Sequence, residues 1–269
     1  MKKELKYVLY VFIGFITLLL LTKPLKEHLI AYDIVELNAR LIVGIIIRLI
    51  IISLSLWVIW KLKLRRYNGL EKNTKIKNLQ LLLIPFLFIL IGLTSNWNTY
   101  INAELNILFL FIASVFIVGF AEELIFRGII LPLFIKYFKN RKNVLFLSVI
   151  ISSSIFGFIH YLNILKEPDN FWGITHQVFF AVSIGVFFGG LMLRTKSILI
   201  PSMFHGFVNF SFGAGELKQN EMEIISKNIA EGINWSSIIP TSLLFAFIFS
   251  AGIYMTKKVD KEIILDKIN

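Results

Sequence analysis

The sequence contains no cysteine, and this absence removes several classes of protein from consideration. Without thiols the chain can form no disulfide, bind no metal through thiolates and use no cysteine nucleophile. Charged residues are also scarce, at 17% of the 269 residues, whereas 57% are hydrophobic. The mean hydropathy of +0.75 is far above that of a soluble globular domain. A water-soluble fold could not bury this much apolar surface.

Hydrophobic runs of about 17 to 22 residues recur along the chain, and a helix of this length crosses a hydrocarbon core roughly 30 Å thick. They predict an all-α, polytopic transmembrane helix bundle of about eight spans. No long soluble segment, fixed-period repeat or low-complexity tract is present, so residues 1–269 are expected to form a single membrane-embedded domain. The spans are expected near residues 7–22, 41–60, 78–94, 105–127, 144–160, 174–193, 198–213 and 237–255.

The net charge of +11 would suit a nucleic-acid-binding protein. However, the Lys and Arg residues lie in short connectors and form no continuous basic face, so no nucleic-acid partner is expected. Every second connector is basic, as in residues 61–77, while the others are neutral or acidic, as in residues 216–231. This alternation follows the positive-inside rule if both termini are cytoplasmic, which requires an even number of spans. The expected location is a cell membrane, in a bacterium the cytoplasmic membrane, with the lipid bilayer as a partner.

A group of charged residues interrupts the apolar sequence in "GFAEELIFRGI", residues 119–129. A charge at bilayer depth costs about 2.5 to 3.5 kcal/mol on insertion scales, and so it needs a partner or a purpose. Glu123 and Arg127 are four positions apart, share a helix face and are expected to form an ion pair with a supporting role. Glu122 is rotated by about 100° and is left without a partner on its own helix. It is therefore a candidate for proton exchange.

Further polar side chains lie in two later apolar runs. "FGFIH" carries Phe156 and His160, and "HGFVN" carries His205 and Asn209, with each pair one helical turn apart. Read singly, His160 is more often an interfacial or packing residue, and the pair in "HGFVN" is equally well explained as polar contacts between helices. Taken with Glu122, these residues amount to a base that activates water, a partner for that base and donors for an oxyanion. Hydrolysis of an acyl bond requires such a set.

The three stretches resemble the EExxxR, FxxxH and HxxxN motifs of the CAAX protease and bacteriocin-processing family of intramembrane endopeptidases, also called the abortive-infection family. They occur here as "EELIFR", "FGFIH" and "HGFVN", in the same order and each on its own predicted span. The resemblance covers about residues 105–213, which it implies to be the catalytic core. The remaining spans match only in being membrane spans.

The resemblance implies a role for each matching position. Glu122 would be the general base that deprotonates a water molecule, and His160 would hold and polarise that water with it. His205 and Asn209 would donate hydrogen bonds to the oxyanion that forms when the peptide carbonyl is attacked. The supporting positions would be Glu123, Arg127 and Phe156.

The resemblance also implies what the protein acts on. The expected substrate is a membrane-anchored, lipidated or otherwise hydrophobic peptide or protein. In bacteria the expected duties are processing of bacteriocin or signalling peptides and self-immunity. The favoured mechanism requires no cofactor, but a divalent metal stays open, since Glu122, His160 and His205 are a permissible zinc set of three protein ligands.

Two other functions are compatible with the same residues. The first is a non-catalytic immunity or scaffold protein that keeps the fold and binds a membrane peptide. The intact motif set argues against it, since a binding module has no need of the base. The second is a proton-coupled transporter in which Glu122 and the histidines form a relay. The motifs have no counterpart in the first half of the chain, so an inverted-repeat architecture finds no support.

Two more polar residues lie in or near predicted spans. Arg48, within "GIIIRLIII", is expected to reach a span end by snorkelling or to pair with an acidic residue. His176 follows a predicted external loop and is expected at the membrane interface, with an accessory role at the site as the alternative.

Straight helices would separate the two motif histidines in depth. His160 would lie about 25 Å along its span and His205 only about 10 Å along its own. A break at Pro132 or Pro201, or tilted helices, would remove this difference.

Overall fold

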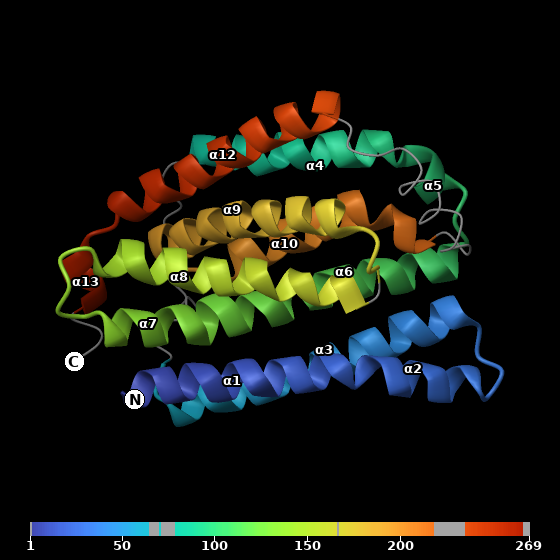
Figure 1. Cartoon of the computed structure of the whole chain (residues 1–269), viewed down its shortest axis with the longest axis horizontal. Helices are drawn as coiled ribbons and strands as arrows, with labels where there is room; N and C mark the ends of the chain where they lie inside the picture. Colours follow the sequence, from blue (N-terminus) through green and yellow to red (C-terminus); the bar gives the residue numbers. More distant parts are fainter. Residues whose placement is uncertain (1, 65–69, 71–78, 166, 218–234, 266–269) are drawn as a thin grey trace.

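The computed structural model describes residues 2–64, 70, 79–165, 167–217 and 235–265, and the secondary structure in these ranges is entirely helical. The helices lie roughly along one axis and form a bundle (Figure 1). The prediction of an all-α, polytopic bundle is confirmed. Most of the predicted basic connector at 61–77 and of the acidic segment at 216–231 lies outside the described residues.

The first part of the chain forms two long helical stretches, Lys3–Ile30 and Glu36–Lys61, and a short helix, Leu83–Ser95, that runs back along the bundle. α1 (Lys3–Leu20) and α2 (Thr22–Ile30) together make a helical stretch of 28 residues, which is longer than the span predicted at 7–22. α3 packs against α2 and leads to α4 after the connector. The elements are α1 (Lys3–Leu20), α2 (Thr22–Ile30), α3 (Glu36–Lys61), the 3-10 turn η1 (Leu79–Leu82), α4 (Leu83–Ser95) and α5 (Trp97–Ile101).

The second part carries the three motifs. Its helices are α6 (Leu105–Ile125), α7 (Leu131–Tyr137), α8 (Val144–Phe158), α9 (Phe171–Thr195), α10 (Leu199–Phe212), α12 (Trp235–Lys257) and α13 (Lys261–Leu265). Three turns of other helix types join them: the π-helical turn η2 (Phe126–Ile130) and the 3-10 turns η3 (Ile159–Leu165) and η4 (Gly213–Leu217).

Six helical stretches of the described chain are long and apolar enough to cross a membrane. They are Lys3–Ile30, Glu36–Lys61, Leu105–Tyr137, Val144–Leu165, Phe171–Thr195 and Ile238–Lys257. The other two predicted spans form shorter helices, α4 with 13 residues and α10 with 14. Both short helices run along the bundle like their longer neighbours (Figure 1). The count of about eight spans stays a prediction.

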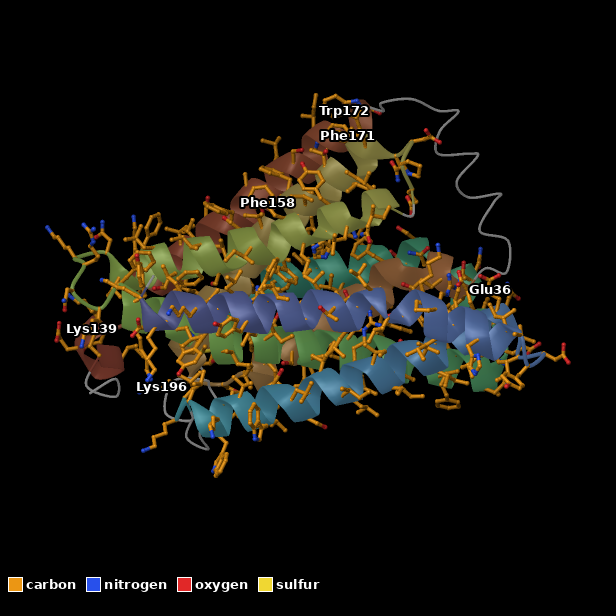
Figure 2. All side chains as sticks on the ribbon, turned by 60° about the horizontal axis from the view of Figure 1, so that its bottom comes forward. Glu36, Lys139, Phe158, Phe171, Trp172 and Lys196 are labelled. Carbon is orange, nitrogen blue, oxygen red and sulfur yellow. The ribbon has the colours of Figure 1, made fainter. Side chains whose placement is uncertain are left out.

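Charge is distributed unevenly between the two ends of the bundle. The start of α1 and the short helix α13 lie at the same end (Figure 1). Lys139 and Lys196 lie at this end, and Glu36 lies at the opposite one (Figure 2). This arrangement fits an even number of passes with the basic connectors on one side. The cytoplasmic location of that side stays a prediction.

α9 is the central helix of the bundle. Of its most apolar stretch 78% is buried inside the protein, against 11 to 44% for the other five spanning stretches. Glycines allow α12 to approach it closely, since a Cβ atom on Gly190 would lie 2.5 Å from the carbonyl oxygen of Gly252. α8 and α10, which carry two of the motifs, pack against this most buried helix.

Candidate active site

Two adjacent glutamates and an arginine occupy the junction between α6 and the π-helical turn η2. Glu123 lies near the end of α6 and Arg127 in the turn that follows. The Nη1 atom of Arg127 donates a hydrogen bond of 2.7 Å to Oε1 of Glu123, and both side chains are at most 1% exposed. The ion pair predicted from the spacing of four is therefore present. Single π-helical turns inside α-helices often mark functional sites.

The buried Arg127 guanidinium is held from three sides. Besides Glu123, it donates a hydrogen bond of 3.0 Å from Nη2 to the carbonyl oxygen of Gly185 in α9. Its Cζ atom lies 4.7 Å from the ring centroid of Phe156 and 5.8 Å from that of Phe188. A carboxylate, a carbonyl and two ring faces compensate the desolvation of this cation. Arg127 thus ties α6 to α8 and α9.

His205 of α10 lies between the two carboxylates. Its Nδ1 atom is 3.0 Å from Oε1 of Glu123, and its Nε2 atom is 3.5 Å from Oε2 of Glu122. Because Oε1 of Glu123 accepts a hydrogen bond from Arg127, we assign the hydrogen of the imidazole to Nδ1. Nε2 and Oε2 of Glu122 then face each other at 3.5 Å. The result is a continuous line of contacts from Arg127 through Glu123 and His205 to Glu122.

The two glutamates differ in exposure. The side chain of Glu123 is fully buried, and its second oxygen, Oε2, has no hydrogen-bond partner. The side chain of Glu122 is 19% exposed. Water and substrate can therefore reach Glu122 but not its neighbour.

His160 does not make the contact with Glu122 that its predicted role suggests. No hydrogen bond or ion pair joins the two side chains in the described part of the chain. Instead, Nδ1 of His160 lies 3.0 Å from the carbonyl oxygen of Phe156. A carbonyl can only accept, so Nδ1 carries the hydrogen and Nε2 of the neutral ring is a free acceptor. The ring is half-buried, and its Nε2 atom makes no hydrogen bond to the described residues.

The expected difference in depth between the two histidines is not seen. α8 ends at Phe158, so His160 lies in the 3-10 turn η3 and not on a straight continuation of the helix. The ring of Phe156 packs edge-on against both histidines, with centroids 5.2 Å from His160 and 5.8 Å from His205. The residue that begins the FxxxH motif therefore joins the motifs of α8 and α10.

Asn209 lies one turn beyond His205 on α10. Its half-buried side chain makes no hydrogen bond to any described residue, so its amide is available as a donor. The end of α10 beside it is fixed by α4 and α5. Asn96 donates a hydrogen bond of 3.0 Å to the carbonyl oxygen of Ser211, and the Tyr100 hydroxyl donates one to that of Phe210. Burial raises the pKa of Tyr100 to about 12, which keeps this donor protonated at neutral pH.

The close approach of α6 and α10 depends on two glycines that the motifs do not include. A Cβ atom on Gly119 would lie 2.8 Å from the backbone nitrogen of Gly206, and one on Gly206 would lie 2.5 Å from the ring of Phe116. The two backbones therefore touch beside the glutamates of α6 and His205 of α10. Sequence reasoning missed both glycines. The available signal was a glycine three residues before Glu122 and another directly after His205.

The three candidate zinc ligands do not converge. No three His, Cys, Asp or Glu side chains of the described chain form a group that could hold a metal ion. Glu122 and His205 are in contact, but the nearest described partner of the His160 ring nitrogen is a backbone carbonyl. The positions of Glu122, His160 and His205 therefore do not fit a zinc site with three protein ligands. The proposed mechanism uses only the side chains of this chain.

His176 and Arg48 make no direct contact with the line of contacts from Arg127 to Glu122 among the described residues. His176 binds Thr241 of α12 through Nε2 at 3.0 Å and packs against Phe245, so it joins α9 to α12. It lies nine residues, or about 13 Å, along α9 from Gly185, too far for a part in the site. Arg48 forms no ion pair within the described residues, although the charges of Glu122 and Glu216 act on it.

One comparison with known families agrees with this geometry. Residues 104–211 match the model of the type II CAAX prenyl endopeptidase Rce1-like family. No curated protein and no solved structure matches the chain. The matched range runs from the residue before α6 to the last turn of α10 and includes all three motifs. Over this range the chain is similar to the Rce1-like family of type II CAAX prenyl endopeptidases.

Proposed function

We propose that this protein is a membrane-embedded endopeptidase that hydrolyses a peptide bond near the end of a membrane-anchored or lipidated peptide or protein. The family match supports protease activity at a coarse level. The observation that carries the proposal is the line of contacts from buried Arg127 to partly exposed Glu122. It provides a carboxylate at a position that substrate and water can reach. The contact with His205 fixes the orientation of this carboxylate.

In the proposed mechanism Glu122 accepts a proton from a water molecule as the oxygen of that water attacks the carbonyl carbon. His205 holds the carboxylate of Glu122 in place, because its other nitrogen is anchored on Glu123. The free Nε2 atom of His160 accepts a hydrogen bond from the same water and orients it. The proton on Glu122 then passes to the leaving amine when the carbon–nitrogen bond breaks.

The oxyanion of the tetrahedral intermediate requires hydrogen-bond donors that are already in position. We assign this role to the Asn209 amide, because it has no partner among the described residues and lies one turn from His205. The resemblance also assigns His205 to the oxyanion. Its two nitrogens both face carboxylates here, which favours the role of holding Glu122 over that of a donor to substrate. Processing of bacteriocin or signalling peptides and self-immunity stay predictions of the resemblance.

The test compares the wild type with Glu122→Gln on a library of membrane-anchored peptides in liposomes. The library contains peptides with and without a prenylated cysteine near the C-terminus, so it also identifies the substrate class. The matched control is Glu36→Gln, which makes the same chemical change in the exposed carboxyl that pairs with Lys26 at the far end of the bundle. Product is expected from the wild type and from the control, but not from Glu122→Gln. Equal cleavage by Glu122→Gln, or no cleavage by the wild type of any peptide, would contradict the proposal.

A further inference from the structure

The last turn of α10 carries Asn209 and ends in carbonyl groups that need donors from outside the helix. A helix leaves its last four carbonyl oxygens without a partner in its own regular hydrogen bonding. In α10 these belong to Asn209, Phe210, Ser211 and Phe212. The backbone nitrogen of Gly213 donates to the first of them. The second and third accept hydrogen bonds from side chains of a distant part of the chain.

These donors belong to the elbow between α4 and α5. The hydroxyl of buried Tyr100 in α5 donates to the carbonyl oxygen of Phe210. Asn96, which separates α4 from α5, donates from Nδ2 to the carbonyl oxygen of Ser211 at 3.0 Å. The same Nδ2 atom donates to the carbonyl oxygen of Gly92 at 3.1 Å, which ties it to its own helix. The elbow therefore caps the C-terminal end of α10.

The elbow and the last turn of α10 also fit closely by shape. The ring of Tyr100 stacks on that of Phe210, with centroids 4.7 Å apart and planes at 21°. A Cβ atom on Gly92 would lie 2.8 Å from Cβ of Ser211, so the backbone of α4 reaches this turn directly. Interiors packed in this way transmit displacement from one element to the next. A shift of the elbow therefore moves the last turn of α10.

Asn209 depends on this turn more than His205 does. The His205 ring is fixed by Glu123 and Glu122, one on each nitrogen. In contrast, the Asn209 side chain makes no hydrogen bond to any described residue, so the backbone of its turn sets where its amide lies. A displacement of about 1 Å in a catalytic group can cost 10²-fold in rate. The proposed oxyanion donor thus needs a turn that is held from outside.

We propose that Tyr100 and Asn96 are positioning residues that hold the Asn209 amide where the oxyanion forms. This inference rests on the proposed endopeptidase function and adds two residues that none of the three motifs contains. Both precede residues 104–211, the range that the family model matches. The matched range therefore does not hold the whole catalytic apparatus, because the elbow before it sets the geometry of its last turn.

The first test is Tyr100→Phe, which removes the capping hydroxyl and keeps the stacked ring. A hydrogen bond of ordinary net strength corresponds to about fivefold to tenfold in an equilibrium constant. We therefore expect kcat on the best library peptide to fall by about fivefold to tenfold, with KM close to that of the wild type. Asn96→Ala should cause a similar fall. Steady-state kinetics in liposomes measure both.

Tyr10→Phe is the matched control. It removes the same hydroxyl from an exposed ring of α1, and kcat should not change. A cap that served only the stability of the fold would lower the unfolding midpoint of Tyr100→Phe and leave the kcat of the folded enzyme unaltered. That outcome would overturn the proposal.

A double-mutant cycle shows whether Tyr100 acts through Asn209. In the Asn209→Ala background, Tyr100→Phe should change kcat by less than about twofold, because the group that it positions is already gone. If Tyr100→Phe lowered kcat by the same factor in both backgrounds, it would act on another part of the site. The proposal would then be wrong.

Amide hydrogen exchange of residues 205–213 separates this inference from the proposed function, since it needs no substrate. Tyr100→Phe should speed exchange in the last turn of α10 by about fivefold to tenfold, and Tyr10→Phe should not. Faster exchange without cleavage of any peptide by the wild type would support the cap and contradict the endopeptidase. Cleavage by the wild type, with kcat and exchange both unchanged in Tyr100→Phe, would support the endopeptidase and overturn the inference.

Discussion

Glu122 and Glu123 are neighbours in the sequence, yet they occupy opposite kinds of environment. Glu123 is fully buried and accepts hydrogen bonds from Arg127 and His205. Glu122 is partly exposed and, among the described residues, its carboxylate contacts His205 at 3.5 Å. A carboxylate that is buried away from water and substrate can fix geometry but cannot exchange protons with a substrate. The comparison therefore assigns support to Glu123 and chemistry to Glu122.

Glu123→Gln is expected to have the largest effect, because it tests whether Glu123 stabilises the fold. The substitution leaves Arg127 as a buried cation with no carboxylate, and the free energy of unfolding should fall by about 3 to 5 kcal/mol. Thermal unfolding in detergent measures the loss. The double variant Glu123→Leu with Arg127→Leu is the control, because it removes both charges and should lose much less. Equal losses in the two variants would contradict the assignment of a supporting ion pair.

Asn209→Ala tests the chemical role proposed for the side chains around partly exposed Glu122. If the amide binds the oxyanion, kcat should fall by about 10²-fold to 10³-fold while KM stays close to that of the wild type. The unfolding midpoint should not move, since the side chain makes no hydrogen bond to described residues. Steady-state kinetics with Asn102→Ala, an exposed asparagine at the end of the bundle, supply the control. A kcat equal to that of the wild type would remove Asn209 from the site.

Gly119→Ala tests whether backbone contact between α6 and α10 sets the position of His205. The added Cβ atom would lie 2.8 Å from the nitrogen of Gly206, so overpacking should cost about 1 to 3 kcal/mol of stability and lower kcat as the helices separate. Gly14→Ala is the matched control, because no atom lies within 4 Å of its Cβ position. That change should leave kcat unaltered and add up to about 1 kcal/mol of helix stability. If both variants had the stability and the kcat of the wild type, the backbone contact would not set the position of His205.

Local spacing was enough to predict the part of the site that lies on one helix. The ion pair of Glu123 with Arg127 follows from a separation of four, and the isolation of Glu122 follows from the rotation between neighbours on a helix. The all-α bundle likewise follows from the length of the apolar runs.

Contacts between helices could not be predicted in the same way. The position of His205 between the two glutamates depends on the crossing of α6 and α10, which is set by the glycines where their backbones touch. The 3-10 turn that carries His160 ends α8 at a point that hydrophobic periodicity does not mark. The sequence therefore named candidate residues, but it did not predict that the ring beside Glu122 is that of His205 and not that of His160.

The most direct test of the central claim is the single-turnover rate of Glu122→Gln on the best peptide substrate, measured beside its unfolding midpoint. Removal of a general base that has no substitute should lower the rate by about 10²-fold to 10⁴-fold. Because Glu122 is partly exposed and does not pair with Arg127, the midpoint should stay close to that of the wild type. A rate within tenfold of the wild type in a folded protein would contradict the account.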